Sequence, residues 1–426
     1  MPSRESKTIA IILGQFISQV GNSVSGFALG LWLFLQTKEV MSLSFVYLFQ
    51  LLPGLIFIIP AGIIVDKFHK KNIIILTDLI SIFFMVLLVI EFYNNRIFSY
   101  EIYLYNSIFS ILNVIQALAL TSLISGFIKA KKQPMFNVLL DSRKYIPRLI
   151  GPLLSVFLLT KGSIISVLIA DISSFLISII ITISFCENKE INPVSKKIHD
   201  RINTLFLLNK IIKSPLLLYT LLCLIFSVLS LSLLGVYIIP LSLSISSKNI
   251  SSQIIAIGGF GSLIGSIIYG FIYKHFNDLK SFVPLSLVLQ GIFLLLMSIN
   301  NSINVYFVTM FLYFLVIPAQ NASSYSLWQR HIESEFCGRL FSIKGFFLQF
   351  ASIIVFIFSG ILEDKVLGPI MKTCNFSKYL NIIMHIFGCG FSRGMSFAIF
   401  ICSISIIIVG TFSYIRLENS PRSIVK

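Results

Sequence analysis

Two aspartates, Asp78 and Asp171, stand inside long apolar stretches of the sequence. An ionised carboxyl is costly in an apolar surrounding, so such a residue is expected to have a function that uses its proton. Asp171 also begins a polar series at helical spacing, with Ser174, Ser178 and Thr182. Hydroxyl groups can bond a carboxyl in either protonation state. For Asp171 the pattern predicts either a proton-carrying site or a bond between helices.

Amide side chains are the second group that could do chemistry. In the first apolar stretch they share one helical face with Ser18 and Ser25. An amide can hydrogen-bond a polar group on a mostly apolar ligand, and it can equally bond a neighbouring helix. We interpret the first stretch as ligand-binding, while both interpretations stay open for the amides further along. These candidates are Gln15, Gln19 and Asn22, then Asn113, Gln116, Gln320 and Asn321.

Other chemistry has little support in the sequence. The five histidines and six cysteines show no metal-ligand spacing, and there is no phosphate-binding P-loop. We therefore expect no metal, no cofactor and no direct use of ATP. A polytopic membrane enzyme would need a cluster of acids, histidines or nucleophiles at one membrane face, and none is visible. Cys374 and Cys389 would share one outer loop, and the sequence leaves both a disulfide and two free thiols as interpretations.

The elements that carry these residues are membrane helices. The chain has 426 residues, of which 56% are hydrophobic and only 12% charged. An apolar run of about 20 residues can cross a bilayer as a helix, whereas a lone strand would leave its backbone unpaired. We predict an all-α polytopic membrane protein with twelve transmembrane helices in two six-helix halves around a central cavity. The expected spans are 9–35, 43–65, 73–91, 100–128, 137–160, 163–185, 215–240, 251–273, 281–299, 304–328, 339–361 and 393–415.

Positive charge is distributed unevenly between the two sides of the membrane. With the N-terminus in the cytoplasm, 25 of the 33 Lys and Arg residues fall on the cytoplasmic side. Membrane proteins favour this distribution, which predicts a multi-pass protein of the cell membrane with both termini cytoplasmic. The net charge of +16 then indicates contact with anionic lipid head groups rather than with nucleic acid.

A polar, basic segment at 187–214 divides the spans into six and six. We expect an N-terminal bundle at 1–186, a cytoplasmic linker loop at 187–214 and a C-terminal bundle at 215–426. The stretch GIIVDKF at Gly62 is weakly similar to GFIYKHF at Gly270. Each stretch follows the second span of its half. This match favours an internal duplication, which many transporters contain.

One short loop concentrates charge in this apolar chain, and it reads GIIVDKFHKK from Gly62 to Lys71. With twelve spans in a six-plus-six layout, this loop resembles the signature of the major facilitator superfamily. His69 stands where many members have glycine. The matching residues are Gly62, Asp66, Lys67, Lys70 and Lys71. The stretches GQFISQVGNSVSGFALGLWLF, ILTDL, LIGPLL, IADISSFLIS and LWQRHIESEFCGRLFS resemble the macrolide-efflux and siderophore-exporter branch.

The resemblance implies roles for several segments. The 62–71 loop is expected to latch one conformation, a role compatible with fixing the topology by its charge. Part of an antiporter motif is matched in the fifth span by Arg148, Gly151 and Pro152. The motif can be interpreted either as a hinge for antiport or as an ordinary helix kink. The first, fourth, seventh and tenth spans are expected to line the cavity.

Asp171 and Asp78 are the candidates for coupling transport to protons. In the resembling family the sixth and third spans, which carry them, pack outside the cavity. For Asp78, placed one turn from the Lys70 and Lys71 loop, we favour a structural ion pair.

We interpret the chain as a secondary active transporter and not as an enzyme. The resemblance implies export of amphipathic small molecules, such as a drug, macrolide, siderophore or peptide-like compound, by alternating access with proton antiport. We expect it to act as a monomer. An importer or facilitator of the same fold remains an alternative.

The charge distribution generates a first prediction. A reporter enzyme fused to the C-terminus should be active only when it is of a type that works in the cytoplasm, because an even number of spans returns the chain to its starting side. Reporter activity is measured in intact cells. A C-terminal reporter active only on the outer side would contradict the twelve-span topology.

Overall fold

The computed structural model describes residues 4–127, 147, 150–185, 204–245, 248–272, 279–300, 302–332, 337–373 and 391–419. The chain divides into two compact units, residues 1–199 and residues 200–426. The boundary lies inside the segment expected to link two bundles. Each unit is described by itself.

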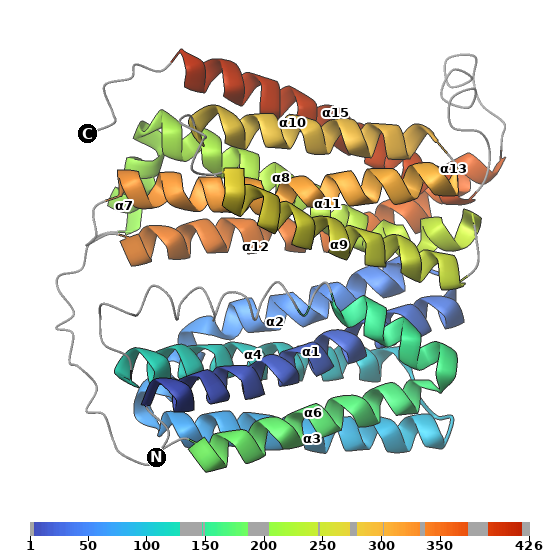
Figure 1. Ribbon diagram of the computed structural model, residues 1–426. Coiled ribbons are helices and arrows are strands. Elements are labelled where there is room, and N and C mark those ends of the chain that lie inside the picture. The colour runs from blue at the N-terminus through green and yellow to red at the C-terminus, as the bar shows by residue number, and fades with distance from the viewer. Residues whose placement is uncertain are drawn as a thin grey trace. The chain divides into compact units, whose positions relative to one another are not determined.

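The first unit contains six described helices that agree closely with the predicted spans (Figure 1). Only two residues, Phe68 and His69, separate the second helix from the third, so the charged turn is as tight as expected. The fifth span is described only from residue 150 onwards. The helices are α1 (Arg4–Thr37), α2 (Val40–Lys67), α3 (Lys70–Tyr93), α4 (Ser99–Phe127), an unlabelled helix (Ile150–Lys161) and α6 (Ile164–Phe185).

The second unit begins with a short helix inside the expected linker loop. Its buried residues Leu207 and Ile211 pack near Trp328, which explains why this segment is helical although it is polar and basic. The expected outer loop at 363–392 also starts as helix, because α12 continues through a π-helical turn. The helices are α7 (Thr204–Lys213), α8 (Pro215–Ile245), α9 (Lys248–Ile272), α10 (Leu279–Ile299), α11 (Ile303–His331), α12 (Cys337–Ile361), η2 (Leu362–Leu367), α13 (Gly368–Thr373) and α15 (Phe391–Glu418).

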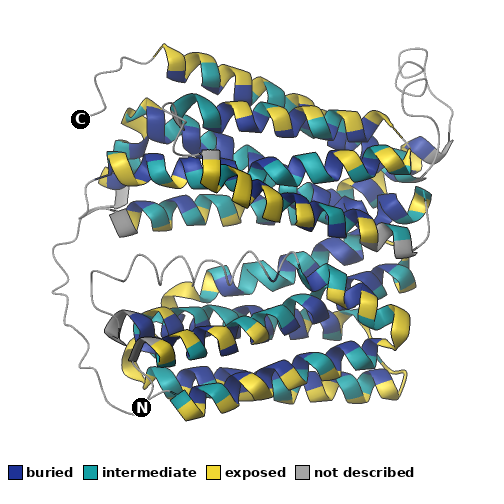
Figure 2. Ribbon diagram, viewed as in Figure 1, coloured by how far each residue is buried: buried dark blue, intermediate teal, exposed yellow. Residues whose placement is uncertain are grey.

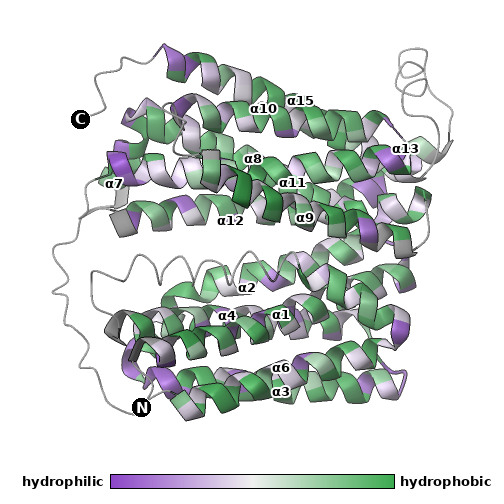
Figure 3. Ribbon diagram, in the orientation of Figure 1, coloured by the Kyte–Doolittle hydropathy of each residue, from purple (hydrophilic) through white to green (hydrophobic). Residues whose placement is uncertain are grey.

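The helices have the length and surface of membrane spans. Ten of those described are long and apolar enough to cross a bilayer. The helix α1, whose polar face lowers its hydropathy, and the fifth span bring the total to the predicted twelve. Large apolar side chains such as Ile59 and Phe271 are about three-quarters exposed, as lipid-facing residues would be. Exposed and hydrophobic positions run along the outer sides of the helices (Figures 2 and 3).

The two units share one order of helix neighbours. In the first unit α4 packs against α2 and α3, and α6 packs against α1 and α3. In the second unit α11 packs in the same way against α9 and α10, and α15 against α8 and α10. The first, second, third, fourth and sixth spans of each half therefore have matching neighbours. This correspondence supports the internal duplication suggested by the sequence.

Small residues allow the closest helix approaches in both units. A Cβ atom at Gly261 or Gly265 of α9 would collide with backbone oxygens of α11. A Cβ at Gly54 of α2 would also collide with Ser110 of α4, at the corresponding place in the first unit. By contrast, apart from the backbone of its own helix and its chain neighbours, no atom of the described residues lies within 4 Å of a Cβ built at Gly62 or Gly270. Gly62 therefore makes no close helix contact within the described structure.

The glycine contacts generate a second prediction. Gly265→Val should lower the thermal stability of the purified protein, because overpacking a tight contact costs about 1–3 kcal/mol. Gly270→Val, on the same helix but with open space around it, is the matched control and should change stability little. Unfolding is followed by fluorescence in detergent. Equal melting temperatures for the two variants would contradict the close α9–α11 contact.

Candidate functional site

Asp171 lies in the interior of the first unit, at the contact between α6 and α1. Its side chain is almost fully buried. Ser25 of α1 donates a hydrogen bond to one carboxylate oxygen, and Ser174 donates to the other at 3.2 Å. Gly21 of α1 makes room for this group, since a Cβ there would collide with Asp171 and Ser174. No basic residue of the described segments contacts the carboxylate.

Asp78 is the centre of a second buried polar group, which joins four helices. Gln116 of α4 donates to one carboxylate oxygen at 2.5 Å. The other oxygen accepts from Ser178 of α6 at 2.9 Å and from Gln15 of α1 at 3.3 Å. Gln15 also donates to Ser178 at 2.7 Å. We call Asp78 with Gln15, Gln116 and Ser178 the acidic hub.

A line of hydroxyls connects the acidic hub with Asp171. Ser174 bonds Asp171 and Ser178 bonds Asp78, and these serines are one turn apart on the same face of α6. Across from them on α1, the buried hydroxyl of Ser18 has no hydrogen-bond partner in the described part of the chain. The polar face of α6 predicted from the sequence is thus buried against α1, and both carboxylates lie along it.

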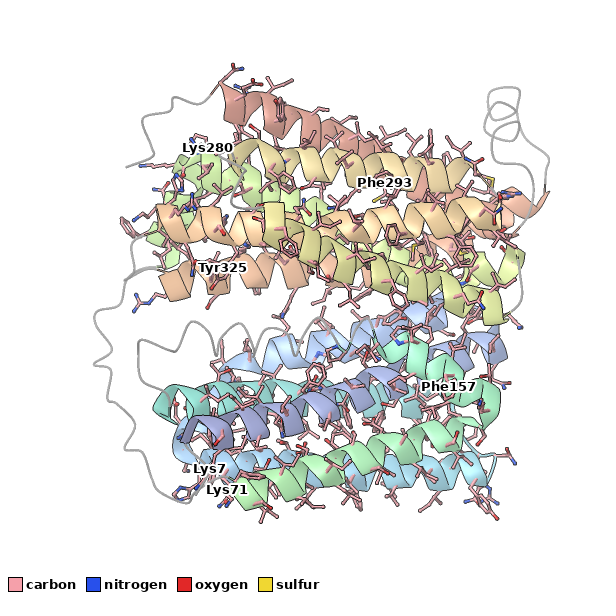
Figure 4. All side chains as sticks on the ribbon, in the orientation of Figure 1. Lys7, Lys71, Phe157, Lys280, Phe293 and Tyr325 are labelled. Atoms are coloured by element: carbon pink, nitrogen blue, oxygen red, sulfur yellow. The ribbon has the colours of Figure 1, made fainter. Side chains whose placement is uncertain are left out.

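The structure describes hydrogen bonds to Asp78 from three helices, and the ion pair favoured for this residue stays a prediction. Asp78 lies roughly two helical turns beyond Lys70, not one, and its described bonds are with amides and a hydroxyl. Lys71 donates to the backbone oxygen of Ile183 at 3.4 Å. That oxygen belongs to the last turn of α6, where a positive charge is favourable. Lys7 and Lys71 lie at the same end of the first unit, and Phe157 lies toward the other (Figure 4).

The structure separates the amides expected to line a ligand cavity. Gln15 and Gln116 are buried in the acidic hub, so they join helices. Gln19 donates to Asn113 at 2.7 Å, and this pair between α1 and α4 is only partly buried. Asn22 is also partly exposed, so these three amides are more accessible than Gln15 and Gln116. The polar residues of α1 therefore do not all line one cavity, because Gln15 enters the acidic hub and Gln19 bonds Asn113.

The second unit contains a neutral counterpart of the acidic hub, in which Gln320 was predicted from the sequence and Ser227 and Gln290 were not. Ser227 of α8 donates to Gln290 of α10 at 2.8 Å, and Gln290 donates to Gln320 of α11 at 2.8 Å. These are the first, third and fourth spans of their half, as α1, α3 and α4 are of theirs. The signal that could have found this group is Gln290, a single amide in an apolar span. Asn321, beside Gln320, is exposed.

The remaining predicted residues lie apart from these buried groups. Asp66 and Lys67 are exposed at the end of α2, with Lys70 in the first turn of α3. Gly151 packs against Ser23 of α1, followed by Pro152 in the same helix. Arg148, Cys374 and Cys389 lie outside the described residues. Within the described residues, no group of His, Cys, Asp or Glu could hold a metal ion.

Comparison with known proteins shows which family has this architecture. The family model of the Major Facilitator Superfamily matches residues 11–356, which is most of the chain. The chain belongs to the Major Facilitator Superfamily. It is therefore a multi-pass membrane transporter rather than an enzyme, and a transporter of this fold implies a small-molecule substrate. A comparison with curated protein sequences gave no match.

Several solved structures share the fold over nearly the whole chain. A bacterial homologue of the iron transporter ferroportin, in an inward-facing state, has a TM-score of 0.71 at 12% identity and covers 98% of this chain and 100% of its own. An occupied, inward-facing bacterial homologue of the human lysosomal transporter Spinster has a TM-score of 0.70 at 11% identity, with 100% and 99% covered. The nucleoside transporter NupG has a TM-score of 0.64 at 13% identity, with 97% and 100% covered. Such low identities establish the fold alone.

The acidic hub generates a third prediction. Gln116→Leu should destabilise the protein by about 1.5–3 kcal/mol, because it removes a hydrogen bond to a charged or strongly polar buried group. Combined with Asp78→Asn, the loss should be smaller than the sum of the two single losses. Thr121→Val is the control, since Thr121 bonds only within its own helix. Additive losses in thermal unfolding would show that Gln116 and Asp78 act separately.

Proposed function

We propose that the protein is a secondary active exporter of amphipathic small molecules that works by proton antiport. The observation that carries this proposal is Asp171, a buried carboxyl bonded to two serines and to no basic group of the described residues. An ionised acid in such a place lacks a counter-charge, whereas the protonated acid can both donate to and accept from the serines. Taking up a proton therefore changes how firmly α1 and α6 are bonded. A conformational cycle can use that change.

The neutral hub of the second unit supports a role for Asp78 as well. In that unit Gln290 occupies the span that corresponds to the one carrying Asp78, and it bonds the neighbouring spans through amide and hydroxyl groups alone. The shared fold can therefore be held together at this place without a carboxyl. The acid at Asp78 adds a titratable group that packing does not require. We assign Asp171 and Asp78 together as the coupling group.

The partly exposed amides support an amphipathic cargo. Gln19, Asn22 and Asn113 offer hydrogen bonds beside large apolar surfaces, and they carry no charge. The direction of transport rests on the stretches that resemble macrolide and siderophore exporters. On the same basis the 62–71 loop latches one conformation and helix Ile150–Lys161 contributes a hinge. The charge distribution supports a cell-membrane protein with cytoplasmic termini, acting as a monomer among anionic lipids.

Proton coupling through Asp171 generates a fourth prediction. Asp171→Asn should abolish the part of erythromycin accumulation in everted vesicles that depends on an imposed pH gradient, because asparagine keeps the shape but cannot titrate. Erythromycin binding should remain. Accumulation is measured with and without the gradient, and vesicles that lack the protein correct for passive partitioning.

Two comparisons make this experiment decisive. Glu418→Gln removes an exposed acid at the end of α15 and should leave the gradient response unchanged. Asp78→Asn should lower the response as Asp171→Asn does, if the two acids form one coupling group. A full response in the Asp171→Asn protein at normal expression would exclude Asp171. Uptake that ignores the gradient in the unmodified protein would favour a facilitator.

A further inference from the structure

A buried lysine in the second unit has no role in the function described so far. Lys344 lies in the first half of α12, and only 8% of its surface is exposed. It is one of the 25 Lys and Arg residues assigned to the cytoplasmic side, although it also falls within the predicted span 339–361. In the structure it lies inside a helix that spans the membrane, so it does not behave as a loop residue.

Aromatic rings and one hydroxyl surround the ammonium group of Lys344. Its Nζ donates to the hydroxyl of Ser324 on α11 at 3.3 Å. It lies 5.0 Å from the ring centroid of Trp328 and 5.4 Å from that of Phe341. Trp328 is held in place by a 2.9 Å hydrogen bond from its indole nitrogen to Thr220 of α8. The pocket for the ammonium is thus built from three helices.

No carboxylate of the described residues neutralises this charge. The helices α7, α8, α9, α10, α11 and α12 contain no Asp or Glu. Along the chain from Lys344, the first acid after it is Glu363 in η2, about 28 Å away by helical rise. Glu333 and Glu335, between α11 and α12, lie outside the described residues and are addressed by the experiment below.

The two aromatic rings compensate this burial only in part. Removing an ammonium ion from water is costly even after a protein relaxes around it. A desolvated cation–π contact recovers part of this cost, and a neutral hydroxyl adds a hydrogen bond. An anion beside Lys344 would supply the missing interaction energy.

A second donor lies one helical turn away. Gln320 is four residues before Ser324 on α11, so the two share a face of that helix. The oxygen of Gln320 accepts from Gln290, but its buried side-chain nitrogen has no acceptor among the described residues. Lys344, Ser324 and Gln320 together present donors and a positive charge, which is the chemistry that recognises an acidic group.

The aromatic side chains extend from this group to the surface of the unit. The ring of Tyr325, which is 45% exposed, lies 4.8 Å from that of Phe341, and Phe341 contacts Trp328. Tyr325 is labelled on α11 in Figure 4. An apolar body could lie along these rings with an acidic end at Lys344. A ligand with one charged end and one apolar end matches this arrangement.

We propose that Lys344, with Ser324 and Gln320, binds the carboxylate of an amphipathic anionic cargo. The assignment of the ligand as cargo rests on the proposed export function. The binding itself does not, because it requires only the second unit's donors and rings. Negative charge on the ligand replaces the counter-ion that the described protein lacks at Lys344.

The test is a fluorescence titration of the purified protein in nanodiscs of neutral phosphatidylcholine. The probes are 11-(dansylamino)undecanoate and its uncharged methyl ester, which differ only at the acidic end. The carboxylate should bind at least about tenfold more tightly, which corresponds to about 1.4 kcal/mol. Lys344→Met should abolish this preference, and Lys344→Arg should keep most of it.

Control variants separate the site from general electrostatics and from folding. Lys213→Met removes an exposed lysine on α7 and should keep the preference. Gln320→Leu should weaken carboxylate binding about threefold with the ester unchanged, and it tests the site even if Lys344→Met fails to fold. Glu333→Gln combined with Glu335→Gln should not change the preference.

Four outcomes would overturn the proposal. The first two are equal binding of the two probes to the unmodified protein and equal weakening of both probes by Lys344→Met. The third is a preference for the carboxylate that first appears when Glu333 and Glu335 are neutralised. The fourth is complete displacement of the probe by anionic phosphatidylglycerol in the nanodisc. The last would identify a lipid as the occupant. No gradient is present in this titration, so its result is independent of proton coupling through Asp171.

Discussion

The free-energy cost of placing a charge inside a membrane protein controls the arrangement of both units. In the first unit it explains why Asp78 receives donors from three other helices and why Gly21 makes room beside Asp171. Each bond to a carboxyl also ties one helix to another. A change in protonation therefore acts on helix packing directly, since the same hydrogen bonds serve both the charge and the bundle. Coupling of a proton to movement requires this kind of shared bond.

The two halves share one helix packing but join their helices through different polar groups. Matching helix neighbours and glycine contacts indicate a common architecture, yet the polar centre is acidic in one half and neutral in the other. The second half instead buries a base, Lys344, which bonds Ser324 of α11, next to Ser323 that bonds Tyr269 of α9. A difference between duplicated halves points to function more directly than a shared feature does, because shared features are explained by the fold alone.

The fold was largely predictable from the sequence, because a span depends only on the length and hydrophobicity of a local run. The helix bounds of α6 and α10 differ from the prediction by no more than two residues at either end. The sites were less predictable, because burial depends on which helix a face meets. Gln15 and Gln19 are four residues apart, yet one enters the acidic hub and the other pairs with Asn113. Lys344 lies within the predicted span 339–361, but its burial depends on the contacts that it makes with Ser324 and Trp328 of α11. The helix α7 was missed because its segment is polar and basic, and because Leu207 and Ile211 are buried by contacts with other helices that the sequence does not show.

The two proposals together have an energetic consequence. If an exported cargo carries one negative charge and exchanges for one proton, both movements carry positive charge inward. Two elementary charges then cross the membrane in each cycle, and each contributes about 2.3 kcal/mol per 100 mV. The membrane potential would drive export alongside the pH gradient, whereas a neutral cargo would gain only half of this electrical term. A buried lysine in one half and buried acids in the other would thus separate the two charged species within one protein, so that the anion and the proton need not neutralise each other at a single site.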